Sequence, residues 1–261
     1  VVIAWTGRKT VEGVAYAADI LFLGFLAFKE LFSPARRGRG EASRIIVRQI
    51  LFTGVDALPV VGALALMLGL IVIIQAGLAL PQVGAGEFLA HIVVAALVRE
   101  LGPLLTAFIV VWRSGTAMCT ELGNMRVGQE IDAIEAMGIS VVRFLVMPRM
   151  VGAIVALTCL TVYFDLVAII GGFLVAKVTL TIPFLVYLED IGRALSVTDV
   201  LITVVKSVLF GLVIAVICCH HGLSVVGDTT EVPQQNARAM LNTVAACLVL
   251  DILVSVGFYV R

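Results

Sequence analysis

Five long apolar runs, separated by short polar segments, dominate the pattern of hydrophobic and polar positions along the chain. They cover residues 57–80, 88–117, 146–176, 200–219 and 237–259. Each run is long enough to cross a bilayer as a helix, which needs about 20 consecutive, mostly apolar residues. The runs are too long for strands, and only helices or closed barrels satisfy their backbone hydrogen bonds in lipid. The pattern therefore predicts an all-α, polytopic membrane protein with five transmembrane helices.

The segment before the first run has a mixed pattern. Between residues 14 and 32, apolar side chains recur at helical spacing, but Asp19, Lys29 and Glu30 are interspersed among them. Because charges are costly in the middle of a bilayer, this pattern favours a helix that lies in the membrane interface. A sixth span is the alternative.

A short helical elbow is expected at residues 44–52, directly before the first run. No internal repeat is evident, so we expect one domain over residues 1–261. Its interfacial and elbow helices occupy residues 1–52, and its transmembrane core occupies residues 53–261.

Basic residues indicate how the helices are oriented. Residues 33–48 contain five arginines and one glutamate, whereas the loop at residues 81–87 has neither lysine nor arginine. Short basic loops remain in the cytoplasm. With five spans, the N-terminus is expected in the cytoplasm and the C-terminus outside. A short helix beginning at Pro183 is expected to rest on the outer surface.

A charged segment, residues 126–138, interrupts the membrane pattern between the second and third runs. It has helical periodicity but is far too short to span. One face would carry Val127, Ile131, Ile134 and Gly138, and the acidic side chains would point elsewhere. This pattern is typical of a solvated surface helix or of a helix that docks a cytoplasmic partner, and by itself it does not separate the two.

Four of the five runs carry charged residues well inside them, away from the run ends. These deep residues are Arg99, Glu100, Asp165, Lys206 and Asp251. Such charges normally face a bundle interior or a wet cavity. Asp165, Lys206 and Asp251 could simply pair with one another. Arg99 and Glu100 pair poorly with each other, because adjacent residues point about 100° apart on a helix. Pro103 should kink the helix directly after them. We therefore expect Arg99 and Glu100 to form a polar site in a central cavity.

The composition excludes several other classes of protein. Hydrophobic residues make up 61% of the chain and charged residues 14%, with no net charge. A nucleic-acid-binding domain would need a basic surplus. The chain has no Gly-Lys dipeptide, so it has no Walker A loop, and ATP-driven transport would need a nucleotide site on another chain. The run Cys-Cys-His-His at 218–221 cannot converge on one ion from consecutive helical positions, so no metal site is expected.

A long, ordered series of motifs resembles the MlaE/YrbE family. The motifs are Arg-Glu-Leu-Gly-Pro at 99–103, Arg-Ser-Gly at 113–115, Glu-Leu-Gly at 121–123, Gln-Glu-Ile-Asp-Ala-Ile-Glu-Ala-Met-Gly at 129–138 and Pro-Arg at 148–149. Members of this family are permease subunits of ABC transporters that work with MCE-domain lipid carriers. The similarity extends from about residue 48 to residue 259.

The resemblance implies the function and the partners. It implies a homodimer in the bacterial inner membrane, with a cytoplasmic ABC ATPase subunit on each half and a periplasmic MCE-domain protein outside. The complex would move phospholipid between the inner membrane and the MCE assembly, for outer-membrane lipid homeostasis. The chain itself would be no enzyme and would hold no cofactor, since ATP and magnesium would bind the ATPase partner. No nucleic-acid partner is implied.

The resemblance also implies two groups of site residues. The helix that couples to the ATPase would comprise Gln129, Glu130, Ile131, Asp132, Ile134, Glu135, Met137 and Gly138. The lipid-binding cavity would comprise Arg99, Glu100, Val72, Ala76, Ala79, Leu80 and Val83, together with Arg48 at the elbow and Arg238. The chain departs from the family after Gly138, where Ile139-Ser140 replaces the usual Asp-Pro.

Two alternatives remain open from the residues alone. A secondary transporter could use Glu100, Asp165 and Asp251 as a proton path, and it would work without a partner or a nucleotide. A non-transporting scaffold would hold no lipid. Neither explains the amphipathic segment at residues 126–138 as economically as a coupling role does.

Overall fold

The computed structural model describes residues 2–31, 39–82, 89–179 and 183–259, and every regular element in these ranges is a helix. The α-helices are α1 (Val2–Leu31), α2 (Arg39–Thr53), α3 (Leu58–Gln82), α4 (Leu89–Val93), α5 (Gly102–Val110), α6 (Thr116–Val127), α7 (Glu130–Ala136), α8 (Met147–Thr179), α9 (Phe184–Ala194), α10 (Val197–Leu223) and α11 (Glu231–Tyr259). A 3₁₀ turn, η1 (Val55–Ala57), joins α2 to α3. Three π-helical segments are η3 (Val94–Leu101), η4 (Val111–Gly115) and η5 (Val142–Val146). The predicted all-α class is confirmed.

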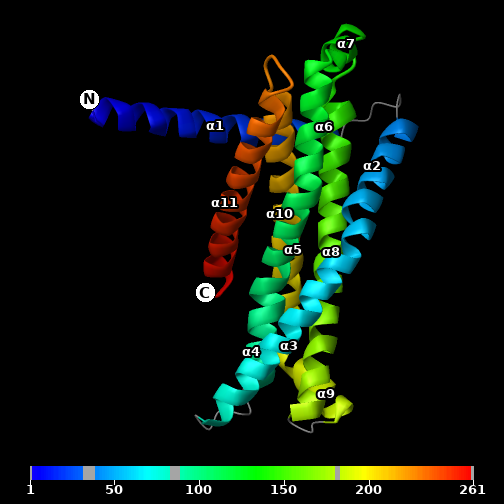
Figure 1. Cartoon of the computed structure of the whole chain (residues 1–261), viewed down its shortest axis with the longest axis vertical. Coiled ribbons are helices and arrows are strands. Elements are labelled where there is room, and N and C mark those ends of the chain that lie inside the picture. The colour runs from blue at the N-terminus through cyan, green and yellow to red at the C-terminus, as the bar shows by residue number, and fades with distance from the viewer. Residues whose placement is uncertain (1, 32–38, 83–88, 180–182, 260–261) are drawn as a thin grey trace.

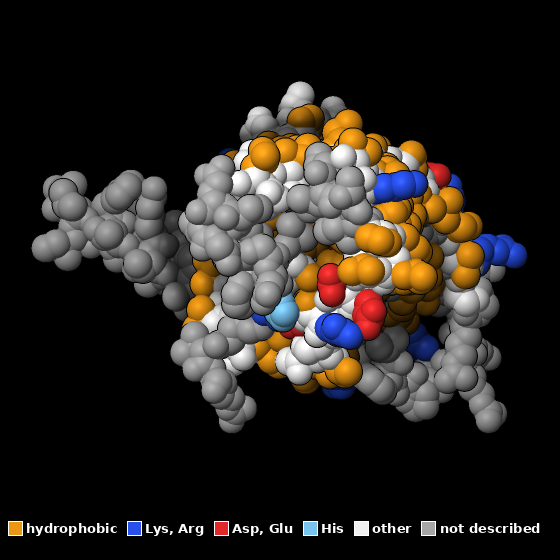
Figure 2. Space-filling view, turned by 90° about the horizontal axis from the view of Figure 1, so that it is seen from below, with side chains coloured by type: hydrophobic (Ala, Val, Ile, Leu, Met, Phe, Trp, Pro, Cys, Tyr) orange, Lys and Arg blue, Asp and Glu red, His pale blue; other side chains and the backbone are white. Residues whose placement is uncertain are grey.

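Five continuous helical stretches are long and apolar enough to cross a membrane. They are Ser43–Leu78, Ala90–Val127, Val142–Val178, Val197–Leu223 and Glu231–Phe258. They form an upright bundle, with α7 at one end and α4 and α9 at the other (Figure 1). We call these the α7 end and the α9 end. Seen from the α9 end, most of the described side chains are hydrophobic, and the few charged ones carry both signs (Figure 2). The five predicted spans are confirmed.

The spans are longer than the apolar runs that predicted them. The second run was expected to end near Ala117, but its helix continues to Val127. The extension is stabilised by packing, since Leu122 is fully buried in a cluster with Val216 and Cys219 of α10. The first span includes the predicted elbow, which is α2. Apolar runs therefore identify the spans, but packing sets where the helices end.

Helix α1 lies across the bundle near the α7 end instead of alongside the spans (Figure 1). It packs against α10, η5 and α8. Ala27 is fully buried there, whereas Leu21, Phe22 and Phe25 are largely exposed. A helix that lies flat and exposes large apolar side chains is typical of the membrane interface. This arrangement agrees with the predicted interfacial helix, and α1 is not among the five membrane-crossing stretches.

Helix α8 is central to the bundle and packs most extensively on α3. Glycines allow this close approach. A Cβ atom added to Gly69 would collide with the backbone carbonyl of Ala168, and one added to Gly171 would lie 2.8 Å from the carbonyl oxygen of Leu66. Small residues at helix contacts of this kind let two backbones come together in membranes.

We expect Gly69→Ala to destabilise the chain by about 1–3 kcal/mol, because the clashing atom belongs to a backbone that cannot rotate away. Gly192→Ala is the matched control. Gly192 also lies inside a helix, but an added Cβ would meet no atom within 4 Å. The control should be neutral or stabilising, since alanine favours helix over glycine. Unfolding of both variants in detergent measures the difference, and equal stability would contradict the packing.

Candidate functional site

Arg99 and Glu100 of the second span lie on a π-helical segment near the α9 end. Arg99 and Glu100 are the sixth and seventh residues of η3, and Pro103 follows one turn later. Proline has no N–H group, so it donates no helical hydrogen bond to the carbonyls of the preceding turn. Two carbonyls of that turn accept hydrogen bonds from α10 instead: Lys206 Nζ donates to Arg99 O at 3.0 Å, and Thr203 donates to Val98 O at 3.1 Å.

Lys206 on α10 binds two carboxylates at once. Its fully buried ammonium lies 2.9 Å from Glu100 Oε2 and 2.8 Å from Asp251 Oδ1 on α11. Ser255, one turn after Asp251, donates a further hydrogen bond to Glu100 Oε1 at 3.0 Å. A fully buried ammonium is stable only when it is paired in this way. The second, fourth and fifth spans are therefore joined by one polar cluster.

Arg99 turns away from this cluster and binds Asp199. Arg99 Nε lies 2.8 Å from Asp199 Oδ1, and Arg99 Nη2 donates to Asp199 Oδ2 at 3.1 Å. Asp199 also belongs to the capping box at the start of α10, where it exchanges hydrogen bonds with Ser196. The expectation that Arg99 and Glu100 do not pair with each other therefore holds, but sequence reasoning missed Asp199.

Asp165 on α8 stays apart from the other intramembrane charges. Its Oδ1 atom is buried, and no hydrogen-bond partner is found for it among the described residues. A Cβ atom added to Gly102 would collide with this oxygen, so the carboxyl group packs directly against the backbone after η3. The idea that Asp165, Lys206 and Asp251 all pair with one another is thus wrong for Asp165.

The other cavity candidates are divided between two levels of the bundle. Val72 and Ala76 on α3 are half-buried and buried, and Val72 packs on the main core. The side chains of Ala79, Leu80 and Val83 lie outside the described residues. Val72 and Ala76 lie toward the α9 end of the first span, in the same direction as Arg99.

Arg48 and Arg238 lie near the α7 end, and both are exposed. Arg48 lines a pocket together with Glu121 of α6. Arg99 and Glu121 belong to the same span, about 33 Å apart along its axis at 1.5 Å per residue. The structure therefore does not bring Arg48 to Arg99 within one chain.

The predicted coupling segment forms helix α7, which is closed by a distinct motif at each end. Gln129 precedes it in the left-handed region, with φ of 57°. At its end, Gly138 has φ of 74°, and its N–H group donates to Glu135 O. The N–H group of Ile139 donates to Ile134 O at 3.2 Å. These two bonds form a Schellman motif, so the helix ends cleanly without the Asp-Pro of the family.

One face of α7 is anchored and the other is exposed. Ile131 is 2% exposed and belongs to the cluster that includes Leu122 and Val216, and Ile134 packs against the same cluster. The remaining predicted coupling residues are exposed; they are Gln129, Glu130, Asp132, Glu135, Met137 and Gly138. Arg126 binds Asp132 across the turn, with a distance of 2.6 Å between Nη1 and Oδ1. A helix that is anchored on one face and exposed on the other can pass a movement of a bound partner on to the bundle.

His221 has a structural role that the sequence did not reveal. Its Nε2 atom lies 2.8 Å from the hydroxyl of Tyr16 on α1, and its Nδ1 atom lies 3.1 Å from Gln235 Oε1 on α11. Burial raises the pKa of Tyr16, which keeps the hydroxyl protonated. Asn242 donates to the same hydroxyl at 2.9 Å. These bonds join α1 to α10 and α11, and the residues are too far apart in sequence for any local signal.

Comparisons with known proteins agree with this architecture. A family model described as "Permease MlaE" matches residues 46–256. A probable ABC transporter permease protein of Rickettsia conorii is 28% identical over 253 residues, which cover 97% of this chain and 96% of the relative. A probable ABC transporter permease protein of Rickettsia bellii is 30% identical over 82% of this chain and 83% of its own length. The chloroplastic protein TRIGALACTOSYLDIACYLGLYCEROL 1 of Arabidopsis thaliana is 26% identical over 83% of this chain and 62% of its own length. Because the family match spans most of its length and all five membrane-crossing helices, this multi-pass membrane protein belongs to the MlaE permease family.

Proposed function

We propose that this chain is the membrane-spanning subunit of an ABC transporter that moves phospholipid between the bacterial inner membrane and a periplasmic MCE protein assembly, for outer-membrane lipid homeostasis. Family membership and relatives that are named ABC transporter permeases support this proposal. The name of the Arabidopsis relative contains a glycerolipid, which fits a lipid cargo. The observation that carries the proposal is α7, an anchored amphipathic helix at one end of a five-span bundle.

In this proposal, the α7 end faces the cytoplasm. The basic segment at residues 33–48 leads into the span that starts at this end, and basic loops remain in the cytoplasm. Arg126, Arg143 and Arg238 lie close to the same end of their helices. The N-terminus is then cytoplasmic, and five spans leave the C-terminus in the periplasm.

The partner at the α7 end is a separate ABC ATPase chain, which binds ATP and magnesium. Glu130, Glu135 and Met137 are exposed and would contact its surface, while Ile131 and Ile134 transmit the movement to the bundle. Coupling requires that the ATPase favour one conformation of the permease over another. Closure of two ATPase subunits would push two α7 helices together.

Two copies of the chain would enclose the lipid cavity near the α9 end. Arg99 and Glu100 would form its polar site. Its apolar wall would comprise Val72, Ala76, Ala79, Leu80 and Val83. Arg99 keeps 28% of its side chain exposed although it is paired with Asp199, so its guanidinium can still meet a phosphate. Arg238 would lie nearer the cytoplasmic end.

We expect Arg99→Ala to reduce the phospholipid that copurifies with the dimer by at least about tenfold, since one charge-assisted hydrogen bond is worth about 1.5–3 kcal/mol and about 1.4 kcal/mol is tenfold. Asp199 retains its bonds to Ser196, so the start of α10 should persist. Phosphorus analysis of the purified protein measures the change. Arg193→Ala is the control, because Arg193 is exposed on α9 and binds only Glu189 among the contacts described. Unchanged lipid in Arg99→Ala would remove this residue from the cavity.

The experiment that tests the whole proposal is purification in mild detergent, followed by identification of the bound proteins and lipids. We expect an ATPase subunit, an MCE-domain protein and glycerophospholipid. Reconstituted complex should move lipid only with ATP. Transport by the isolated chain without nucleotide would instead indicate a secondary transporter, and a complex without bound lipid would indicate a scaffold.

A further inference from the structure

A pocket opens between the elbow helix α2, helix α6 and the start of the third span. Its volume is about 400 Å³. Its lining includes Ile45, Arg48, Gln49 and Phe52 of α2, Glu121 of α6 and Arg149 of α8, and the remaining lining residues are apolar. Ligand pockets commonly have about 300–1,000 Å³ and combine apolar walls with a few polar groups. This pocket has that character, with two arginines and one glutamate among mostly apolar side chains.

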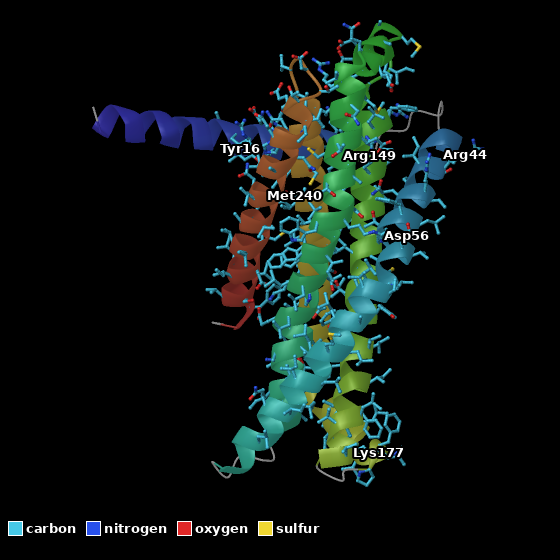
Figure 3. The ribbon with its side chains drawn as sticks, viewed as in Figure 1. Tyr16, Arg44, Asp56, Arg149, Lys177 and Met240 are labelled. Atoms are coloured by element: carbon cyan, nitrogen blue, oxygen red, sulfur yellow. The ribbon has the colours of Figure 1, made fainter. Side chains whose placement is uncertain are left out.

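Arg149 is the built-in polar group of the pocket. Its side chain is 6% exposed, and its Nη2 atom lies 3.0 Å from Glu121 Oε2. Its Nη1 atom is buried and has no hydrogen-bond partner among the described residues. A buried charged donor without an acceptor is costly, so such a group in a pocket wall favours an acceptor supplied by a water or a ligand atom. Figure 3 places Arg149 in the half of the bundle nearest α7.

Close packing fixes the α2 wall of the pocket. A Cβ atom added to Gly152 on α8 would lie 2.7 Å from Gln49 Cβ. Gln49 also donates a hydrogen bond to Thr53 at 2.8 Å, one turn further along α2. Because α2 is seated directly on the α8 backbone here, the pocket is preformed. Arg48, next to Gln49, is exposed at its edge.

The pocket lies at the depth of lipid headgroups. The second span has 38 residues, or about 57 Å of helix, whereas the hydrocarbon core of a bilayer is about 30 Å thick. Its ends must therefore project through the headgroup layers. Glu121 lies about 9 Å from the α7 end of this span, and Arg149 lies about 10 Å from the corresponding end of the third span.

We propose that this pocket binds the headgroup of a glycerophospholipid that carries a primary ammonium, taken from the leaflet at the α7 end. The phosphate accepts hydrogen bonds from Arg149 Nη1 and from Arg48, and the ammonium binds the exposed carboxylate of Glu121. The glycerol and the first part of the acyl chains lie against Ile45 and Phe52. This assignment deepens the proposed lipid transport and rests on it, and it adds a site about 33 Å along the span from Arg99.

Binding to the delipidated full-length chain in detergent tests this site. The probes are short-chain phosphatidylethanolamine, short-chain phosphatidylglycerol and inorganic phosphate, and native mass spectrometry counts the adducts. We expect Arg48→Gln and Arg149→Gln to weaken phosphatidylethanolamine binding by at least about tenfold, since each removes a charge-assisted bond. Glu121→Gln should weaken binding of phosphatidylethanolamine but not that of phosphatidylglycerol.

Arg44→Gln is the matched control, because Arg44 lies one turn before Arg48 on α2 and does not line the pocket. It should bind like the unmodified chain. If Arg149→Gln fails to fold, the exposed Arg48 still decides the outcome. Equal binding by the unmodified chain and Arg48→Gln would overturn the proposal. Inorganic phosphate that competes as well as the lipid would also overturn it, in favour of a free-anion site.

The outcome is independent of the transport assay. Lipid binding is measured without the ATPase, so a complex that fails to transport leaves the binding result intact. Loss of the site, in turn, leaves the proposed transport through the Arg99 cavity intact. Arg99→Ala should reduce lipid at that cavity and keep the adduct that depends on Arg48.

Discussion

Lys206→Met is expected to lower the free energy of unfolding by about 3–5 kcal/mol, the usual cost of removing one partner from a buried ion pair. Methionine fills a similar volume, so the loss is mainly electrostatic. Glu100 and Asp251 would remain close together without the ammonium that lies between them. The carbonyl of Arg99 would lose its hydrogen bond from Lys206 as well. Thermal or detergent-induced unfolding of the purified protein measures the effect.

A second substitution separates the charge effect from packing. Lys206→Met combined with Asp251→Asn should recover part of the lost stability, because only one carboxylate is then left without a cation. Lys177→Met, at the exposed end of α8, serves as the control and should stay within about 0.5 kcal/mol of the unmodified chain. A Lys206→Met protein that unfolds like the unmodified one would show that the ammonium does not hold the three spans together.

The spans could be predicted because apolar length alone decides whether a helix can cross a bilayer. Part of the buried face of α7 could be predicted for a similar reason, since the spacing of Ile131 and Ile134 places both on one side. Gly138 was expected on the same face, but it lies past the end of α7, where its positive φ closes the helix, and it is exposed. The helix ends could not be predicted. Glu121 begins a polar stretch, but α6 continues past it because Leu122 finds apolar partners on α10. Those partners are distant in sequence.

The partners of the intramembrane charges were also beyond local reasoning. Asp199 follows Ser196 at the spacing of a capping box, so its position is fully explained by the start of α10. Nothing nearby indicates that it also binds Arg99, a hundred residues away. The unpaired Nη1 atom of Arg149 and the pocket around it likewise exist only after α2, α6 and α8 have packed together.

Glu135→Lys should abolish most ATP-dependent lipid transport, by at least about tenfold, while the chain folds normally. Glu135 is exposed on α7, so its replacement should change stability by less than about 0.5 kcal/mol. A reversed charge at a docking surface costs several kcal/mol when it meets a complementary surface, with about 1.4 kcal/mol for each tenfold loss. Copurification of the ATPase and lipid transfer in liposomes measure the two consequences.

Asp228→Lys and Ile131→Ala distinguish a contact through α7 from other effects. Asp228 is also an exposed acid at the α7 end but lies in the loop between α10 and α11, so reversing its charge should leave transport intact.

Ile131 is buried, so its truncation should cost about 2–5 kcal/mol and loosen α7 from the bundle. That variant should still bind the ATPase through Glu135 but hydrolyse ATP without moving lipid. If Glu135→Lys and Asp228→Lys lose transport equally, the ATPase is held by the total charge at the α7 end of the bundle and not by a contact with α7.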